Sequence, residues 1–277
     1  MKIYSTLQGI LPNTSDYSHI GAGSYKDVFK ALVSDSGKYE TIKLTRVPTE
    51  EHLKRILREV DSLKQCDCDH IIKLGTIDYR PVSIDDGIFL IHSEEYLDSG
   101  SLRDSLDAEA EPTVAQVIDL AISMLKAVEE MWKNKIIHRD IKPANIMLSA
   151  DSRNFILIDL GIAFLSDGER LTDDTNPANA LSTPAYKPPE MNVRGFRDTF
   201  DFRSDLYSLG LVLFEYAAGV HPFYTKEWMS KDFQSLNSYR SDIPEELERI
   251  IMSLMRKNSA FRPTRIDKLV SNLEVLK

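Results

Sequence analysis

Residues 138–145 read His-Arg-Asp-Ile-Lys-Pro-Ala-Asn, and this octet constrains the chain more than any other segment. Fourteen residues after Asn145, Asp159 follows within an apolar Leu-Ile-Asp-Leu-Gly run. The two segments supply two carboxylates, a cation and an amide. Phosphoryl transfer from a nucleotide needs a base at the acceptor hydroxyl, positive charge near the moving phosphoryl group and oxygen ligands for Mg²⁺. The pattern therefore predicts that chemistry.

The 277 residues are enough for one large domain or for one domain in two lobes. A content of 42% hydrophobic and 28% charged residues is ordinary for a globular protein. The net charge of −9 argues against a non-specific partner that is itself acidic, such as nucleic acid or an anionic membrane surface.

The two cysteines, Cys66 and Cys68, are separated by one residue and have no second pair to complete a zinc site. We expect two free thiols in a reducing compartment. The amino terminus lacks the apolar stretch of a signal peptide, and Leu206–Val220 is interrupted by Glu215 and too short to span a bilayer. These features predict a cytoplasmic protein.

From Tyr17 to about Phe89 the pattern is typical of strands, with a turn-rich loop over Asp78–Gly87 and a strand over Ile88–Ile91. One amphipathic helix interrupts this region, with apolar residues at helical spacing. Its apolar positions are Leu53, Ile56, Leu57, Val60 and Leu63.

Beyond Gly100 the pattern becomes helical. Thr113–Gln116 is a capping-box sequence that opens an apolar-faced helix. A second helix is expected to begin at Asp205 and to be apolar on nearly all sides through Ala218, and Pro244 is expected at the first position of a third. The chain is thus an α+β protein.

With these motifs in order, the chain from about Tyr17 to its carboxyl end resembles the eukaryotic-like Ser/Thr protein kinase family, whose signature includes His-Arg-Asp…Asn and an Asp-x-Gly. The resemblance implies the bilobal protein-kinase fold, with a small β-rich N-lobe carrying one main helix, a larger α-helical C-lobe, and ATP between them. It divides the chain into a short N-terminal extension (1–15) and a kinase domain (16–277). Within that domain it implies an N-lobe over about 16–95, a hinge over about 95–100 and a C-lobe over about 101–277.

The nucleotide-binding motifs of the family have counterparts here. Residues 20–28 resemble the glycine-rich loop, although Lys26 stands where a third glycine is usual. Lys43 resembles the strand lysine that contacts the α- and β-phosphates, and Glu59 resembles its helix partner; Arg55 or Arg58 is the alternative partner for Glu59. The implied nucleotide-binding residues are Ile20, Gly21, Gly23, Val28, Lys43, Glu59, Glu95, Leu97 and Met147.

By this resemblance, Glu94 occupies the position that borders the deep end of the nucleotide pocket, where an apolar residue or Thr is common in the family. Two interpretations stay open. Either Glu94 makes a polar contact with Lys43, or the alignment is off by one residue.

For the chemistry, the resemblance assigns catalytic roles to Asp140, Lys142 and Lys43. Asp140 is the base and Lys142 stabilises charge on the transferring group, while Asn145 and Asp159 hold the metal. The Lys-Pro-x-Asn form is that of Ser/Thr kinases. His138 is expected to be a packed structural residue, and Arg139 to accept an activation-segment phosphate.

Residues 159–190 correspond to the activation segment, in which Thr183 bridges the catalytic groups. Glu190 and Arg262 are expected to form a buried pair, and Asp205 to anchor the backbone of the catalytic loop. Thr172 and Thr175 are the candidate regulatory sites, modified by autophosphorylation through self-association. In the alternative, Asp173 and Asp174 replace that phosphate.

The implied cofactors are ATP and Mg²⁺, with Mn²⁺ as a substitute metal, and the partners are protein substrates rather than nucleic acid or membrane. Two alternatives remain. A pseudokinase acting as a nucleotide-gated scaffold is favoured by Lys26 and Glu94, and a small-molecule kinase is disfavoured by the complete activation segment.

Overall fold

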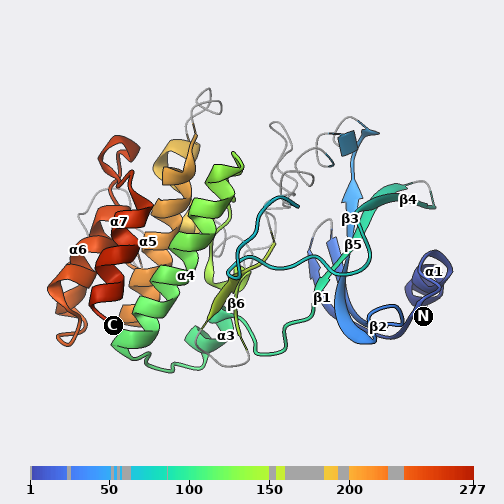
Figure 1. Cartoon of the computed structure of the whole chain (residues 1–277), viewed down its shortest axis with the longest axis horizontal. Helices are drawn as coiled ribbons and strands as arrows, with labels where there is room; N and C mark the ends of the chain where they lie inside the picture. The colour runs from blue at the N-terminus through green and yellow to red at the C-terminus, as the bar shows by residue number, and fades with distance from the viewer. Residues whose placement is uncertain are drawn as a thin grey trace. The chain divides into compact units, whose positions relative to one another are not determined.

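A computed structural model describes residues 2–23, 26–50, 53–54, 57, 64–85, 87–149, 154–159, 184–192, 200–223 and 234–277. The expected helix over residues 53–63, including Glu59, lies largely outside the described residues, as do Thr172, Thr175 and Thr183. The chain divides into two compact units (Figure 1). The first takes its described residues from 1–65 and 72–98, and the second from 66–71, 99–161 and 174–277.

The first unit is built on a five-stranded antiparallel sheet with the strand order β1-β2-β3-β5-β4. Its strands are β1 (Thr14–Gly23), β2 (Lys26–Val33), β3 (Lys38–Val47), β4 (Arg80–Ile84) and β5 (Gly87–Glu95). Strand β3 is central and pairs with β5 over eight residues, from Glu40 opposite Glu95 to Val47 opposite Ile88. Because side chains alternate between the two faces of a strand, this register decides which residues share a face.

The predicted loop over Asp78–Gly87 was wrong in part, because β4 lies within it. Pro81, Ser83 and Asp85 are turn-forming residues and obscured the alternation of Val82 and Ile84. Both apolar side chains pack against the buried cluster of the sheet. Pairing with β5 therefore overrode the local preference, and Pro is tolerated here because β4 is an edge strand.

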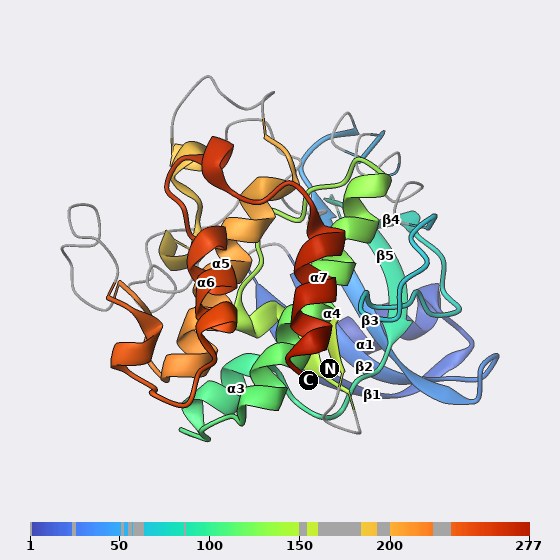
Figure 2. The same ribbon diagram turned by 60° about the vertical axis from the view of Figure 1, so that its left-hand side comes forward.

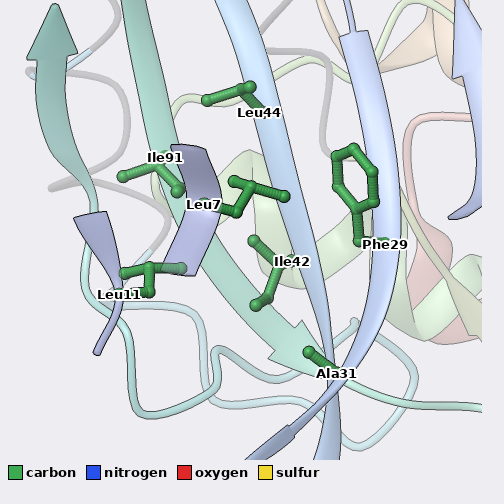
Figure 3. Packing of buried hydrophobic residues seen from close by; sticks show 7 residues of the cluster. All are labelled: Leu7, Leu11, Phe29, Ala31, Ile42, Leu44 and Ile91. Carbon is green, nitrogen blue, oxygen red and sulfur yellow. The ribbon is translucent and has the colours of Figure 1, made fainter. Parts of the chain in front are cut away.

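Helix α1 (Lys2–Ile10) covers one face of this sheet. Figure 3 shows Leu7 of α1 and Leu11, which follows the helix directly, beside side chains of the central strands. Arg80 donates to the carbonyl of Ile10 at 2.9 Å and so satisfies one of the free carbonyls at the helix end. The buried cluster comprises Leu7, Leu11, Phe29, Ala31, Ile42, Leu44 and Ile91. The sequence pattern predicted only an extension here, so α1 is a finding of the structure.

The second unit is mainly helical, and α4, α5, α6 and α7 form its body (Figure 2). Its helices are α3 (Leu102–Asp107), α4 (Val114–Lys133), α5 (Phe202–Ala218), α6 (Glu245–Leu254) and α7 (Ile266–Val275). The capping box is confirmed, since Thr113 and Gln116 exchange side-chain and backbone hydrogen bonds at the start of α4. Together the β-rich first unit and the helical second unit confirm the α+β class.

Two predicted helix starts need correction. Helix α5 begins at Phe202 rather than Asp205, because the Asp201 side chain accepts from the Arg203 amide as an N-cap. Pro244 is the N-cap of α6 rather than its first residue. The apolar character of α5 is as expected, with every residue from Leu206 to Ala217 buried. Among the described residues, no helix combines the length and the apolarity needed to cross a membrane.

A two-stranded hairpin follows the octet. The 3₁₀ turn Pro143–Asn145 leads directly into β6 (Ile146–Leu148), which pairs with β7 (Phe155–Leu157). The Ile158 amide then donates to the Asn145 carbonyl at 2.9 Å. The hairpin therefore brings Asp159, the next residue, back to the end of the octet.

Replacing Leu7 by Ala tests whether α1 is an integral part of the first unit. Leu7 is fully buried in the cluster, so truncation removes apolar burial and leaves a cavity. We expect a loss of about 2–5 kcal/mol in unfolding free energy, measured by urea denaturation. Gln8→Ala, at an exposed position of the same helix, is the control; equal midpoints for both variants would contradict an integral α1.

Candidate functional site

The described residues of the glycine-rich loop, 20–23 and 26–28, lie on β1 and β2. Gly21 pairs with Val28, and Gly23 with Lys26. A Cβ built on Gly21 would meet Val28 at 3.8 Å, an ordinary contact. Packing in the sheet therefore does not require glycine at this position, and Ile20 beside it is 47% exposed.

Lys43 lies on β3 and is ion-paired with Glu94 of β5. The distance from Lys43 Nζ to Glu94 Oε2 is 2.7 Å, and both side chains are buried. The register explains the contact, because Lys43 is opposite His92 and Glu94 is two residues further along the same face. Of the two interpretations of Glu94, the structure bears out the polar contact with Lys43.

The environment of Glu94 keeps it ionised. Burial by itself raises the pKa of this carboxyl, but the Lys43 ammonium and the His92 ring together hold the pKa at about 2. The opposing charge therefore outweighs desolvation. Lys43 and Glu94 form a charged pair at neutral pH.

His92 completes this network and was missed by the sequence analysis. Its Nε2 lies 3.2 Å from Glu94 Oε1, and its ring stacks on Tyr79 with centroids 3.9 Å apart and an interplanar angle of 13°. The sequence did contain a signal for this contact. Residues two apart in a strand point to the same face, and His92 and Glu94 are two apart.

The predicted hinge begins at the end of β5. The Glu95 amide donates to the Lys73 carbonyl at 3.0 Å, and the Glu95 carboxylate accepts from the Lys73 amide at 3.1 Å. Thr41 donates to the Glu95 carbonyl at 3.4 Å. Leu97 lies two residues beyond the end of the strand. Both predicted hinge residues, Glu95 and Leu97, belong to the described part of the first unit.

The catalytic loop in the second unit is held by Asp205, as predicted. Its two carboxylate oxygens accept from the amides of His138 and Arg139, each at 2.8 Å. Asp205 is 1% exposed, and its burial raises the pKa of the carboxyl against the effect of these donors. Arg139 adopts φ 67°, in the left-handed region, so the loop backbone bends sharply here.

His138 is a packed structural residue, as expected. It is fully buried, with Nε2 lying 3.2 Å from the Ile158 carbonyl and Nδ1 accepting from the Asp140 amide at 3.3 Å. This arrangement corresponds to the neutral ring with its proton on Nε2. His138 thereby links the octet to the residue before Asp159.

The polar groups of the octet converge on Asp140. Lys142 Nζ lies 2.7 Å from Asp140 Oδ2, and Asn145 Nδ2 donates to the same oxygen at 3.1 Å and to the Asp140 carbonyl at 2.9 Å. Met147 lies next on β6, opposite Ile156. Asp159, at the end of the hairpin, has a φ of 64° and therefore lies in the left-handed region, as Arg139 does.

Glu190 and Arg262 form the predicted pair, although Glu190 is only partly buried. Two guanidinium nitrogens contact the two carboxylate oxygens at 2.5 and 2.8 Å. The Arg262 side chain is fully buried and also donates to the carbonyls of Arg203, Arg256 and Lys257. Burial raises the pKa of the Glu190 carboxyl. The contact with Arg262 lowers this pKa by more than burial raises it, so the net shift is downward.

A further buried carboxylate, Glu215 of α5, was not assigned a role. It accepts from the Tyr186 hydroxyl and from Arg103 at 3.1 Å. Burial and the Glu215 charge raise the pKa of Tyr186, which stays a donor. These partners explain how a charged residue is tolerated within an apolar helix.

The chain is similar to known proteins of one family. Residues 14–273 match the family model described as the protein kinase domain. The chain is 31% identical over 214 residues to serine/threonine-protein kinase cst-1 of Caenorhabditis elegans, covering 74% of this chain and 38% of that protein. The Caenorhabditis briggsae protein of the same name is 31% identical over 209 residues, with the same coverage. The chain thus spans well under half the length of these curated relatives.

Among solved structures, the kinase domain of Mycobacterium tuberculosis PknI superposes with a TM-score of 0.69, at 18% identity over 95% of this chain and 97% of that one. At this identity the likeness shows the fold, which is that of a protein kinase domain. The chain belongs to the protein kinase domain family.

Asp205→Asn tests the anchoring of the catalytic loop. Asn offers one acceptor and places its NH₂ against a backbone donor, so one of the two amides loses its partner. We expect a stability loss of about 1–3 kcal/mol and faster hydrogen exchange at the amides of His138 and Arg139. Mass spectrometry of peptides that span residue 138 measures the exchange. Asp107→Asn, with a mostly exposed side chain, should leave exchange unchanged; unaltered exchange in Asp205→Asn would contradict the anchor.

The low pKa of Glu94 predicts how stability depends on pH. Because the folded pKa of about 2 lies below the ordinary 4.5, the stabilisation is complete above about pH 4.5 and is lost as the pH falls towards the folded value. The unfolding free energy of the wild type should fall more steeply with acidification than that of Glu94→Gln, by roughly 3 kcal/mol at most. Urea denaturation between about pH 5 and pH 3 measures this difference, and parallel curves would contradict it.

Proposed function

We propose that the chain is an ATP-dependent protein Ser/Thr kinase that transfers the γ-phosphoryl group of ATP to Ser or Thr hydroxyls of protein substrates. The observation that carries the proposal is the convergence of Lys142 and Asn145 on the Asp140 carboxylate. The kinase family membership supports it. The proposed kinase domain covers residues 16–277, with an N-lobe over about 16–95, a hinge over about 95–100 and a C-lobe over about 101–277. The proposed location is the cytoplasm, where the free thiols of Cys66 and Cys68 are stable.

Asp140 has the properties of the proposed base. Its amide is held by His138, and its carboxylate is partly exposed, so the acceptor hydroxyl of a substrate can approach it. The Lys142 ammonium beside it supplies positive charge at the point where the phosphoryl group moves. In this role Asp140 orients the hydroxyl and accepts its proton.

The donor set fits a hard divalent cation. Because the Asn145 amide nitrogen donates to Asp140, its oxygen is the atom left to bind a metal. The Asp159 carboxylate follows directly after the Ile158 amide that bonds Asn145. Mg²⁺ binds such oxygen ligands and, when bound, neutralises charge on the phosphates. We propose Asn145 and Asp159 as its ligands, with Mn²⁺ as a substitute.

In the first unit, Lys43 is the proposed phosphate ligand and residues 20–28 the proposed phosphate-covering loop. The Glu95 carbonyl and the Leu97 backbone are the proposed adenine contacts, and Met147 of the second unit is a proposed apolar contact. Glu59 keeps its proposed role as a helix partner of Lys43. Protein substrates are the proposed partners, with self-association for autophosphorylation.

The pseudokinase alternative has one observation in its favour, namely that Lys43 is bound to Glu94. It predicts nucleotide binding without transfer. Asp140 distinguishes the two functions because it acts in transfer and not in binding.

Asp140→Asn should keep the fold and ADP binding but lose transfer by about 10²–10⁴-fold, because the hydroxyl loses its base. The assay is incubation with labelled ATP, Mg²⁺ and a generic basic protein, followed by phosphoamino-acid analysis. Asp107→Asn on α3 is the exposed control. Near-native transfer by Asp140→Asn would overturn the assignment, and no transfer by the wild type would favour the scaffold.

A further inference from the structure

The buried ion pair between Lys43 and Glu94 is set by the strands that carry it. Strands β3 and β5 pair without interruption from Glu40–Glu95 to Val47–Ile88. The backbone ladder therefore fixes where the Glu94 side chain leaves β5 relative to Lys43. A partner on a neighbouring strand is held more rigidly than one on a separate helix, because the two backbones are hydrogen-bonded to each other.

The carboxylate is itself oriented by its second oxygen. Glu94 Oε2 faces Lys43 at 2.7 Å, whereas Oε1 faces His92 at 3.2 Å. The His92 ring is stacked on Tyr79 and is 4% exposed, so it has little freedom to move away. Each oxygen thus has one partner, and rotation of the carboxylate would cost both contacts.

An ammonium group carries three N–H donors. The contact with Glu94 uses one of them. Because Lys43 is 5% exposed, it needs a counter-charge in the absence of phosphate. Glu94 supplies that charge and restricts the rotamers of the lysine before the nucleotide binds.

We propose that Glu94 is a positioning residue for phosphate binding by Lys43, and that His92 orients the Glu94 carboxylate. This inference rests on the proposed function, in which Lys43 contacts the nucleotide phosphates. It assigns a specific role to the carboxylate that departs from the usual apolar residue or Thr at this position. The opposite effect, in which Glu94 withdraws Lys43 from the phosphates, is the competing outcome of the test.

The test compares Glu94→Gln with Glu40→Gln. Glu40 is a matched control because it is also a buried glutamate of the β3–β5 region, at 5% exposure, but it accepts from Ser93 and Thr76 on the opposite face from Lys43. Both variants lose one buried charge. A general loss of stability therefore affects both, whereas loss of lysine positioning affects only Glu94→Gln.

ADP affinity is measured by titration calorimetry below the unfolding transition of each variant, and kcat and KM for ATP by phosphate transfer. We expect Glu94→Gln to bind ADP about tenfold more weakly and to lose roughly 10- to 100-fold in kcat/KM for ATP. The KM for the protein substrate should stay unchanged. Glu94→Asp, which keeps the charge, should recover part of the ADP affinity, and Glu40→Gln should bind ADP as the wild type does.

Wild-type or tighter ADP binding by folded Glu94→Gln would overturn the inference, as would a Glu94→Asp variant no better than Glu94→Gln. If Glu94→Gln does not fold, His92→Phe tests the inference instead. This variant keeps a ring on Tyr79 but removes the donor to Glu94. Its ADP affinity should then fall severalfold, and an unchanged value would overturn the inference. If the wild type and Asp140→Asn transfer equally little phosphate, the proposed function fails, while the ADP titrations still decide the role of Glu94.

Discussion

The geometry of the catalytic loop depends on one buried carboxylate. Asp205, in the first turn of α5, accepts from two successive backbone amides, those of His138 and Arg139. Two such amides can point at one carboxylate only if the chain bends, and Arg139 provides the bend with its positive φ. Because α5 is buried on nearly all sides, its first turn is a rigid support for this contact. The positions of Asp140, Lys142 and Asn145 follow from it.

Other carboxylates of the molecule are also buried and held by polar partners. Glu94, Glu190 and Glu215 are buried or half-buried carboxylates with two polar partners each, and at least one partner of each lies on another segment of the chain. Replacing such groups by apolar residues can be neutral for stability, whereas removing one partner is strongly destabilising. Their consistent effect is therefore on geometry. Each pair specifies which segments meet and in which orientation.

Contacts that depend on local sequence or on a recognised motif were predicted well. The capping box of α4 uses residues three apart, and such a pattern acts within one helical turn. The contacts of Asp205 with the octet and of Glu190 with Arg262 join distant residues, and they were predictable because the family motifs fix both ends. Strand β4 was missed because its residues favour turns in isolation, and pairing with β5 decided its conformation. Helix α1 was missed because its stability comes from burying Leu7 and Leu11 on the sheet.

The sequence by itself determined the family, the α+β class, the order of the motifs and the chemical types of the candidate catalytic residues, since these depend on residue identity and spacing along the chain. Tertiary structure decided which buried groups meet. The register of β3 and β5 placed Lys43, Glu94 and His92 on one face, and a shift of one residue would have separated Lys43 from Glu94. Strand pairing is a long-range hydrogen-bonding arrangement whose alignment is chosen by the packing of the whole sheet. For this reason Glu94 could be identified as a partner of Lys43 only from the structure of the sheet.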